Sequence, residues 1–348
     1  MKYCRPFLEF FFGLSLLAGL ALLAGCGPGK TSSQEVAYVS IPQAFLRDQV
    51  AAVYNKTGSV KNGEAVEVLG RDRRFVRVRT SAGAEGWLEQ RYLVSQETYD
   101  GFQKLAQQAR SAPVQATAIA HNQTNIHLQP ERSAEHLYQV DQGARLSLLQ
   151  RGSNERVLPG AQARAASAGK EGQTTVAAPP MEDWWLVRDE QGHVGWVLGR
   201  MLDIDVPIEI AQYSEGQRLV ASFVLDRVTD GERKVPQYLV LFTENQDGMP
   251  FDFNQIRVFT WNVKRHRYET AYRERNLDGV LPVTVSHETF DKEGDLPVFV
   301  VRVKDDAGNL IERKYKLNTP IVRRVLAPGE QKKAVGREPS AVRKKKKR

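Results

Sequence analysis

The sequence has 348 residues, and its 41% hydrophobic content is enough for small cores in two or three domains. The formal net charge is +8, but nine cations and two carboxylates between Pro328 and Arg348 account for seven of these charges. The rest of the chain is nearly neutral, which excludes a protein that is basic throughout and indicates a basic tail.

The first 26 residues have the pattern of an export signal. Lys2 and Arg5 precede a mostly apolar run at 7–22, and the small-residue quartet LAGC follows at 23–26. The run is too short and too poorly flanked for a transmembrane helix, whereas a charged leader, a short apolar core and small residues are typical of a cleaved signal peptide. The quartet resembles a bacterial lipobox, in which signal peptidase II cuts before the cysteine and the thiol carries the lipid.

This resemblance implies a lipoprotein signal peptide at 1–25 and lipidation of Cys26, with an uncleaved anchor and an incidental cysteine as the alternative. Gly27 follows the cysteine, so the aspartate that retains lipoproteins in the inner membrane is missing. We therefore expect a chain anchored in the bacterial cell envelope, at the outer membrane and facing the periplasm, with residues 26–35 as a polar tether. The other cysteine, Cys4, lies in the discarded leader, which excludes disulfides, thiolate zinc sites and Cys-His nucleophiles from the mature chain.

One sequence unit occurs twice. FVRVRTSAGAEGWLEQRYL, at 75–93, has alternating apolar residues on both sides of a glycine-bearing turn, as has WWLVRDEQGHVGWVLGRML at 184–202. Such patterns predict β-hairpins. The match continues upstream, because FLRD at 45–48 aligns with NIHL at 125–128 at a spacing of 80 residues. The Gly-Trp pairs at 86–87 and 195–196 are 109 residues apart, so the second copy carries an insertion.

Each copy resembles a bacterial SH3-type domain. The shared features are a short opening segment (LRD, and NIHLQP in the second copy), a glycine before the next strand, an aromatic-led strand and a terminal Gly-Trp followed by a short turn. The resemblance covers 36–94 and 116–203 and implies two small barrels that recognise cell-wall peptide, glycan or a protein partner. The first copy departs from the usual Ser/Gly/Pro-rich opening turn at 49–54. Residues 152–181 are rich in Gly, Ala, Ser and Pro, which predicts a flexible insert.

Residues 95–115 connect the two copies. Apolar residues recur there at helical spacing behind Ser95, a good N-cap residue, and this predicts an amphipathic helix with Tyr99, Phe102, Leu105, Ala106 and Ala109 on one face. We interpret that face as packing against a neighbouring domain, with a partner site as the alternative.

Residues 205–326 contain about seven short strand candidates that are separated by turn-like breaks such as Asp247-Gly248 and Asp278-Gly279. This spacing predicts an antiparallel β-sandwich or meander. The fold class as a whole is therefore mostly β, with two small SH3-like barrels and a C-terminal all-β domain.

Candidate binding residues are aromatic side chains and arginines, the types that carry binding hot spots. In the two copies, the tryptophans of the Gly-Trp pairs either fill the core or line a groove, and one member of the adjacent 184–185 pair should point outward because neighbouring strand residues face opposite ways. In the C-terminal domain, the segment 257–275 concentrates aromatics and cations, with a half-buried sheet as the alternative. The candidates are Trp87, Trp184, Trp185, Trp196, Arg257, Trp261, Tyr268 and Arg273.

The sequence contains no motif of a known catalytic or cofactor site. The six histidines lack HExxH or paired metal-ligand spacing, and no GxSxG, Walker or Rossmann glycine pattern occurs. The SxxK match at 167–170 has no KTG partner. We therefore expect a binding protein that is not an enzyme and has no metal and no cofactor beyond the lipid on Cys26. The alternative is a structural or assembly scaffold in which the C-terminal β domain binds proteins.

The tail at 327–348 has too little apolar content to fold, and its like charges repel one another, so we expect disorder. Export makes nucleic acid an improbable partner. Anionic lipid, lipopolysaccharide phosphates and wall carboxylates are the polyanions that a basic tail would meet outside the inner membrane. The alternative is a tail that only keeps the protein soluble. The cations that end the chain are Arg343, Lys344, Lys345, Lys346, Lys347 and Arg348.

Overall fold

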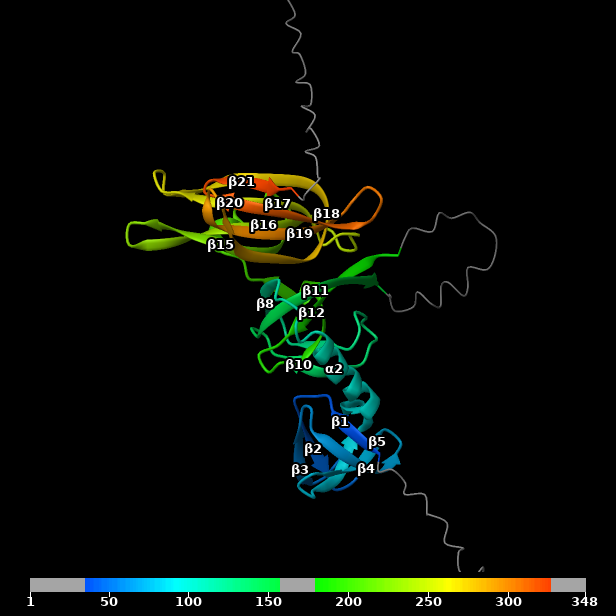
Figure 1. The fold of residues 1–348 in the computed structure, drawn as a ribbon. Coiled ribbons are helices and arrows are strands. Elements are labelled where there is room, and N and C mark those ends of the chain that lie inside the picture. Colours follow the sequence, from blue (N-terminus) through cyan, green and yellow to red (C-terminus); the bar gives the residue numbers. More distant parts are fainter. Residues whose placement is uncertain (1–34, 157–178, 327–348) are drawn as a thin grey trace, which may run out of the picture.

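The computed structural model describes residues 35–156 and 179–326. The predicted signal peptide, Cys26, most of the tether, the middle of the insert and the basic tail lie outside these residues. The described chain forms three seven-stranded antiparallel sheets that follow one another in a row (Figure 1). The prediction of a mostly β protein is confirmed. None of the described helices has the length and apolar character needed to span a membrane.

The first sheet is a small barrel whose strands run in the order β3-β2-β6-β5-β4-β1-β7. Alternate residues point inward and are fully buried, among them Leu46, Val60 and Val76. The elements are β1 (Val36–Val39), β2 (Gln43–Arg47), β3 (Lys56–Lys61), β4 (Ala65–Asp72), β5 (Phe75–Thr80), β6 (Glu85–Glu89), the 3-10 helix η1 (Gln90–Tyr92) and β7 (Leu93–Ser95).

The second sheet has the order β10-β9-β13-β12-β11-β8-β14, which is the order of the first sheet shifted by seven strands. The repeat found in the sequence therefore corresponds to two sheets of one topology. The elements are β8 (Ala116–Ala120), β9 (Thr124–His127), β10 (His136–Val140), β11 (Arg145–Glu155), β12 (Met181–Arg188), β13 (Val194–Leu198), the 3-10 helix η2 (Gly199–Met201) and β14 (Leu202–Ile204).

The predicted insert at 152–181 is wrong at both ends. β11 continues through Glu155 and pairs with Met181, the first residue of β12. The Gly-rich composition suggested that the strands end earlier, but the alternation of β12 into its apolar half extends the β11–β12 ladder. Residues 157–178 lie outside the described residues.

The glycine of each Gly-Trp pair closes its barrel. β6 meets β2 only at Trp87–Arg47, and β13 meets β9 only at Trp196–His127. A Cβ on Gly86 would lie 2.7 Å from Leu46 Cβ and 3.0 Å from the Arg47 carbonyl oxygen. A Cβ on Gly195 would lie 2.8 Å from the His127 carbonyl oxygen and would also clash with Ile126. The closing strands can approach this closely only because no side chain stands between them.

Helix α2 (Gln96–Gln108) connects the first two sheets, as the sequence predicts. The Ser95 hydroxyl accepts a hydrogen bond from the Thr98 amide at 3.1 Å and caps the helix. On its apolar face, Phe102 is 1% exposed and packs against Tyr138 of the second sheet. Tyr99 stacks on Tyr38 of β1 with 3.8 Å between ring centroids. The stripe is therefore a packing face that contacts both sheets.

The third sheet is a meander, because its seven strands pair in chain order from β15 to β21. This decides between the two predicted architectures. The short helix α4 places the fully buried Ile210 against the side chains of Tyr238 and Phe259. The elements are α4 (Ile208–Ala211), β15 (Arg218–Asp230), β16 (Arg233–Thr243), β17 (Phe253–Asn262), β18 (Arg267–Phe290), β19 (Gly294–Lys304), β20 (Leu310–Asn318) and β21 (Ile321–Val325).

The second and third sheets share one hydrophobic core, which includes Trp185 and Leu148 from the second and Val283 from the third. Within this contact, the Gln115 side-chain oxygen accepts a buried hydrogen bond from the Val283 amide at 2.7 Å.

A buried arginine joins the rim of this contact. Arg151 of β11 is 9% exposed at its side chain and donates to Asp183 at 2.6 Å and to the carbonyl oxygen of Phe251 at 2.9 Å. Its other donor atom also lies 3.4 Å from the Asp252 carboxylate. These bonds tie β11 and β12 to the loop between β16 and β17.

The closing glycines give the first prediction. Gly86→Ala and Gly195→Ala should each lower the free energy of unfolding by about 1–3 kcal/mol, because the new methyl group overpacks a strand crossing. Gly70→Ala is the matched control, since a Cβ there meets nothing within 4 Å. Urea unfolding followed by circular dichroism measures all three, and equal stabilities would contradict this account of the Gly-Trp pair.

The buried arginine gives the second prediction. Arg151→Ala leaves the Asp183 and Asp252 carboxylates buried without their cation and should cost about 3–5 kcal/mol of unfolding free energy. Arg145→Ala removes an exposed partner of Asp205 from the same strand and should cost about 1 kcal/mol or less. Thermal unfolding by calorimetry compares them. A similar small loss in both variants would show that Arg151 does not hold the two sheets together.

Candidate functional site

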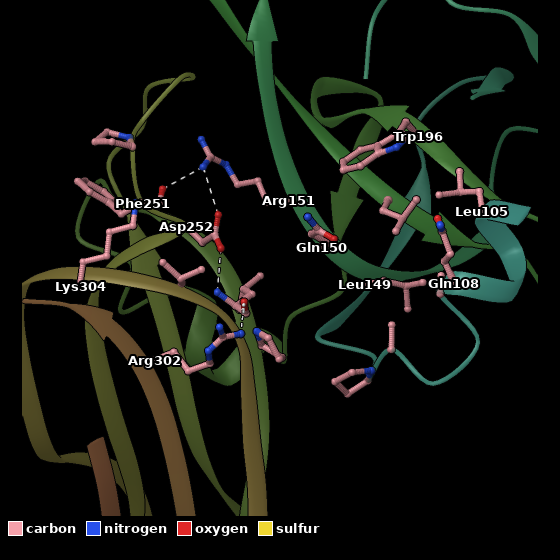
Figure 2. Close-up of a pocket in the computed structure, with 18 residues that line it drawn as sticks. Leu105, Gln108, Leu149, Gln150, Arg151, Trp196, Phe251, Asp252, Arg302 and Lys304 are labelled. Carbon is pink, nitrogen blue, oxygen red and sulfur yellow. Dashed lines mark hydrogen bonds and ion pairs between the residues drawn. The ribbon is translucent and has the colours of Figure 1, made fainter. Parts of the chain in front are cut away.

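A cleft of about 600 Å³ lies between the second and third sheets, next to the end of α2. Figure 2 shows Trp196, Leu105 and Leu149 on one side of it and Arg302, Lys304 and Asp252 on the other. We call the first side the apolar wall and the second the cationic wall. This volume is in the range of sites for small molecules and short peptides.

The apolar wall is built from α2 and strands β11 to β13. Trp196 is half-buried and lies opposite Leu186 in the β12–β13 ladder. These two residues pack with Ala109 and Leu149 in a small cluster of their own. Gly152 supports the ring from β11, because a Cβ there would lie 2.8 Å from Trp196 Cζ3. The indole therefore rests on backbone and keeps part of its surface open to the cleft.

The cationic wall comes from β19 and from the loop before β17. Val301 and Val303 are fully buried in the core, so Arg302 and Lys304 point to the opposite face of the strand. Arg302 donates to the carbonyl oxygen of Leu281 at 3.5 Å. Its planar guanidinium has five donors, and most of them remain available.

Asp252 lies at the inner end of the cationic wall. Its carboxylate accepts a hydrogen bond from the Leu281 amide at 2.8 Å and contacts Arg151. Burial raises the pKa of this carboxyl, while the amide and the Arg151 guanidinium oppose that shift. The negative charge of Asp252 is thus compensated within the protein.

Two exposed amide side chains stand on the apolar side of the cleft. Gln108 is the last residue of α2, and Gln150 follows an irregularity in the β11–β12 ladder. Each amide offers both donors and an acceptor. The cleft therefore combines an aromatic surface, neutral amides and two cations.

Of the four predicted tryptophans, Trp196 lines the cleft and Trp87 is half-buried in the first sheet, beside Arg47. The expectation that Trp184 or Trp185 points outward is wrong, because they are 2% and 6% exposed. β12 is an inner strand with both faces covered. Trp184 contacts the His127 ring at 5.4 Å between centroids, and Trp185 lies in the core shared with the third sheet.

In the third sheet, Arg257 is 1% exposed and therefore unavailable as a surface residue. Its guanidinium donates to the Tyr213 carbonyl oxygen at 2.7 Å and to Glu215 at 2.9 Å. Arg273, which is exposed, donates to the other oxygen of Glu215 at 3.0 Å. Both arginines thus share one carboxylate, and hydrogen bonds from both lower the pKa of Glu215.

The aromatic candidates of the third sheet have intramolecular partners too. Trp261 Nε1 donates to Asp230 at 2.8 Å, and the Tyr268 hydroxyl donates to the Pro236 carbonyl oxygen at 3.0 Å. Tyr268 is 8% exposed, and burial raises its pKa above the ordinary value. The half-buried sheet, the alternative from the sequence, describes this region better than a binding surface, and none of the four candidates lines the cleft.

Arg302, Lys304 and the amides were not found from the sequence. The alternation of 298–304 places Arg302 and Lys304 on one face, which is the signal that was available. What faces them depends on the packing of two sheets that are more than 100 residues apart at this point. Among residues 35–156 and 179–326, no group of three or more His, Cys, Asp or Glu side chains could hold a metal ion.

The third prediction concerns the support of Trp196. Gly152→Ala should push the indole ring into the cleft, because the half-buried ring can move and the strand cannot. In protein labelled with 5-fluorotryptophan, the ¹⁹F resonance that disappears in Trp196→Phe should shift in Gly152→Ala and the other four should stay in place. Gly70→Ala serves again as the control. An unshifted Trp196 resonance would show that the ring does not rest on Gly152.

Comparisons with known proteins give one family match. Residues 43–94 match the bacterial SH3 domain. No curated protein matches the sequence. A solved structure of an NlpC/P60 family protein from Bacillus cereus ATCC 10987 is similar at 12% identity and a TM-score of 0.22, over 56% of this chain and 65% of that one, just under two thirds of its length. NlpC2 from Trichomonas vaginalis is similar at 9% identity and a TM-score of 0.17, over 84% of this chain and 96% of its own. Structural likeness this low carries no argument, so the match assigns a bacterial SH3 domain to residues 43–94 and nothing further.

Proposed function

We propose that the chain is a non-catalytic lipoprotein of the bacterial cell envelope that binds cell-wall peptide or glycan. The observation that carries this proposal is the half-exposed Trp196 on the wall of a 600 Å³ cleft. Aromatic faces pack against sugar rings and apolar side chains, and clefts of this size enclose small ligands. The SH3 match in the first sheet supports a wall ligand, since the resemblance implies wall recognition.

The second sheet is, in this proposal, a second SH3-type domain. Its strand order repeats that of the first sheet, and its closing glycine occupies the equivalent strand crossing. Phe75 and Trp184 also correspond, since each leads its strand and is buried beside the residue at the crossing, Arg47 or His127. These shared contacts support a common origin of the two barrels.

The order of the sheets fits an anchored binding protein. With lipid on Cys26, the membrane lies at the N-terminal end, before the first sheet. The cleft lies beyond the first sheet and α2 along the row of sheets (Figure 1). Gly27 after the cysteine favours the outer membrane, with the folded part in the periplasm. The terminal cations at 343–348 would then add a second, salt-sensitive contact with anionic lipid, lipopolysaccharide or wall carboxylates.

A scaffold role is the second candidate function. The third sheet ends at the short edge strand β21, where Ile321 is 51% exposed. Edge strands accept an added strand from another protein. In that case the third sheet would be the protein-binding part.

The fourth prediction tests wall binding. The chain without its leader should sediment with purified sacculi, and Trp196→Ala should weaken binding at least about tenfold, as expected for the loss of a buried aromatic anchor. Trp87→Ala is the matched control in the first barrel and should bind as the parent does. The assay is run at low and at high salt, because salt screens the contribution of the basic tail.

Two outcomes would contradict the proposal. Absence of sedimentation at both salt concentrations would leave no wall ligand. A loss of binding in Trp87→Ala together with full binding in Trp196→Ala would move the site to the first barrel. Circular dichroism of both variants confirms that the fold is intact.

A further inference from the structure

We infer that the cleft selects a short acidic peptide, with a carboxylate held by Arg302 and Lys304 and an apolar side chain on Trp196. This inference rests on the proposed function and narrows its ligand from peptide or glycan to a peptide with a free carboxylate.

The charge of the cationic wall is the first argument. Among the described residues, no carboxylate lies within 4.0 Å of the Arg302 or Lys304 side-chain nitrogens. Glu312 stands opposite Arg302 on β20, and Asp278 stands opposite Lys304 on β18, without forming such a pair. Most cations of this sheet do form one, for example Arg313 with Glu274 at 2.8 Å. Two adjacent cations without an ion-pair partner in a cleft favour an anionic ligand.

The shape of the charge favours a carboxylate. Arg302 is half-buried and is held at one end by the Leu281 carbonyl oxygen, so its planar fork is oriented before a ligand arrives. Such a fork binds a carboxylate through two parallel hydrogen bonds. Asp252, the nearby carboxylate of the same wall, is engaged by Arg151 and the Leu281 amide, so it leaves the charge of Arg302 unopposed.

The opposite wall supplies what a peptide needs besides charge. Trp196, Leu149 and Leu186 offer an apolar surface for one side chain. Gln108 and Gln150 offer amides that pair with peptide N–H and C=O groups. A neutral sugar would use the indole but would have no group for the two cations. The combination therefore matches an acidic peptide better than a glycan.

The fifth prediction uses two tripeptides with the full chain. Isothermal titration compares N-acetyl-Ala-Glu-Leu with free carboxylates and the same peptide with both carboxylates amidated. The free acid should bind at least about tenfold more tightly, as expected for a charge-assisted pair. Arg302→Gln should abolish this difference, and Lys304→Gln should reduce it. Arg265→Gln removes an exposed cation far from the cleft lining and should leave the difference unchanged.

The possible results separate this inference from the proposed function. Equal binding of acid and amide, or an unchanged preference in Arg302→Gln, would overturn the carboxylate assignment even if Trp196→Ala still loses sacculi. Tight binding of the acid through Arg302 without any binding to sacculi would support the acidic-peptide site and place its source in a protein, which overturns wall binding. A soluble muropeptide that binds as well as the tripeptide, with its disaccharide alone not binding, would support both.

Discussion

The buried side chain of Arg151 is the interaction on which the upper half of the molecule depends. It lies at 9% exposure between Asp183, Asp252 and two carbonyl oxygens of the loop before β17. A guanidinium that has lost its water must keep all of these partners, because each unpaired buried charge costs several kcal/mol. The second and third sheets therefore meet in one geometry. The cleft exists because that geometry brings β11–β13 opposite β19.

The sequence predicts much of the local structure. Period-two alternation places the strands, the Ser95 cap places α2, and the spacings of 80 and 109 residues reveal two sheets of one topology. The wrong expectation for Trp184 was avoidable within the same logic. The repeat aligns Trp184 with Phe75, which is 5% exposed, and both aromatic rings cover the strand crossing of their barrel. The burial of Trp185 was not predictable, since it depends on the third sheet.

The cleft could not be predicted because its parts come from separate levels of structure. Alternation along β19 puts Arg302 on an outer face, and the hairpin pattern puts Trp196 on the outside of its barrel. Neither pattern states that the two faces look at each other. That relation is set by tertiary packing, which also decides the fate of Arg257. Its sequence context resembles a binding hot spot, but its partners Tyr213 and Glu215 turn it into a structural residue.

Equivalent positions in the two barrels show how one topology acquires a site. Arg71 of the first copy aligns with Arg151 at the spacing of 80, yet Arg71 stays exposed and pairs with Glu35, whereas Arg151 is buried under the third sheet. One position further on, Asp72 aligns with Gly152, whose lack of a side chain lets the Trp196 ring rest on β11. β11 also extends through Glu155, which lengthens its ladder with β12 beyond that of β4 with β5. The binding surface thus arises from the contact between the second barrel and the meander, so that changes at this contact, rather than in either barrel core, should decide what the protein binds.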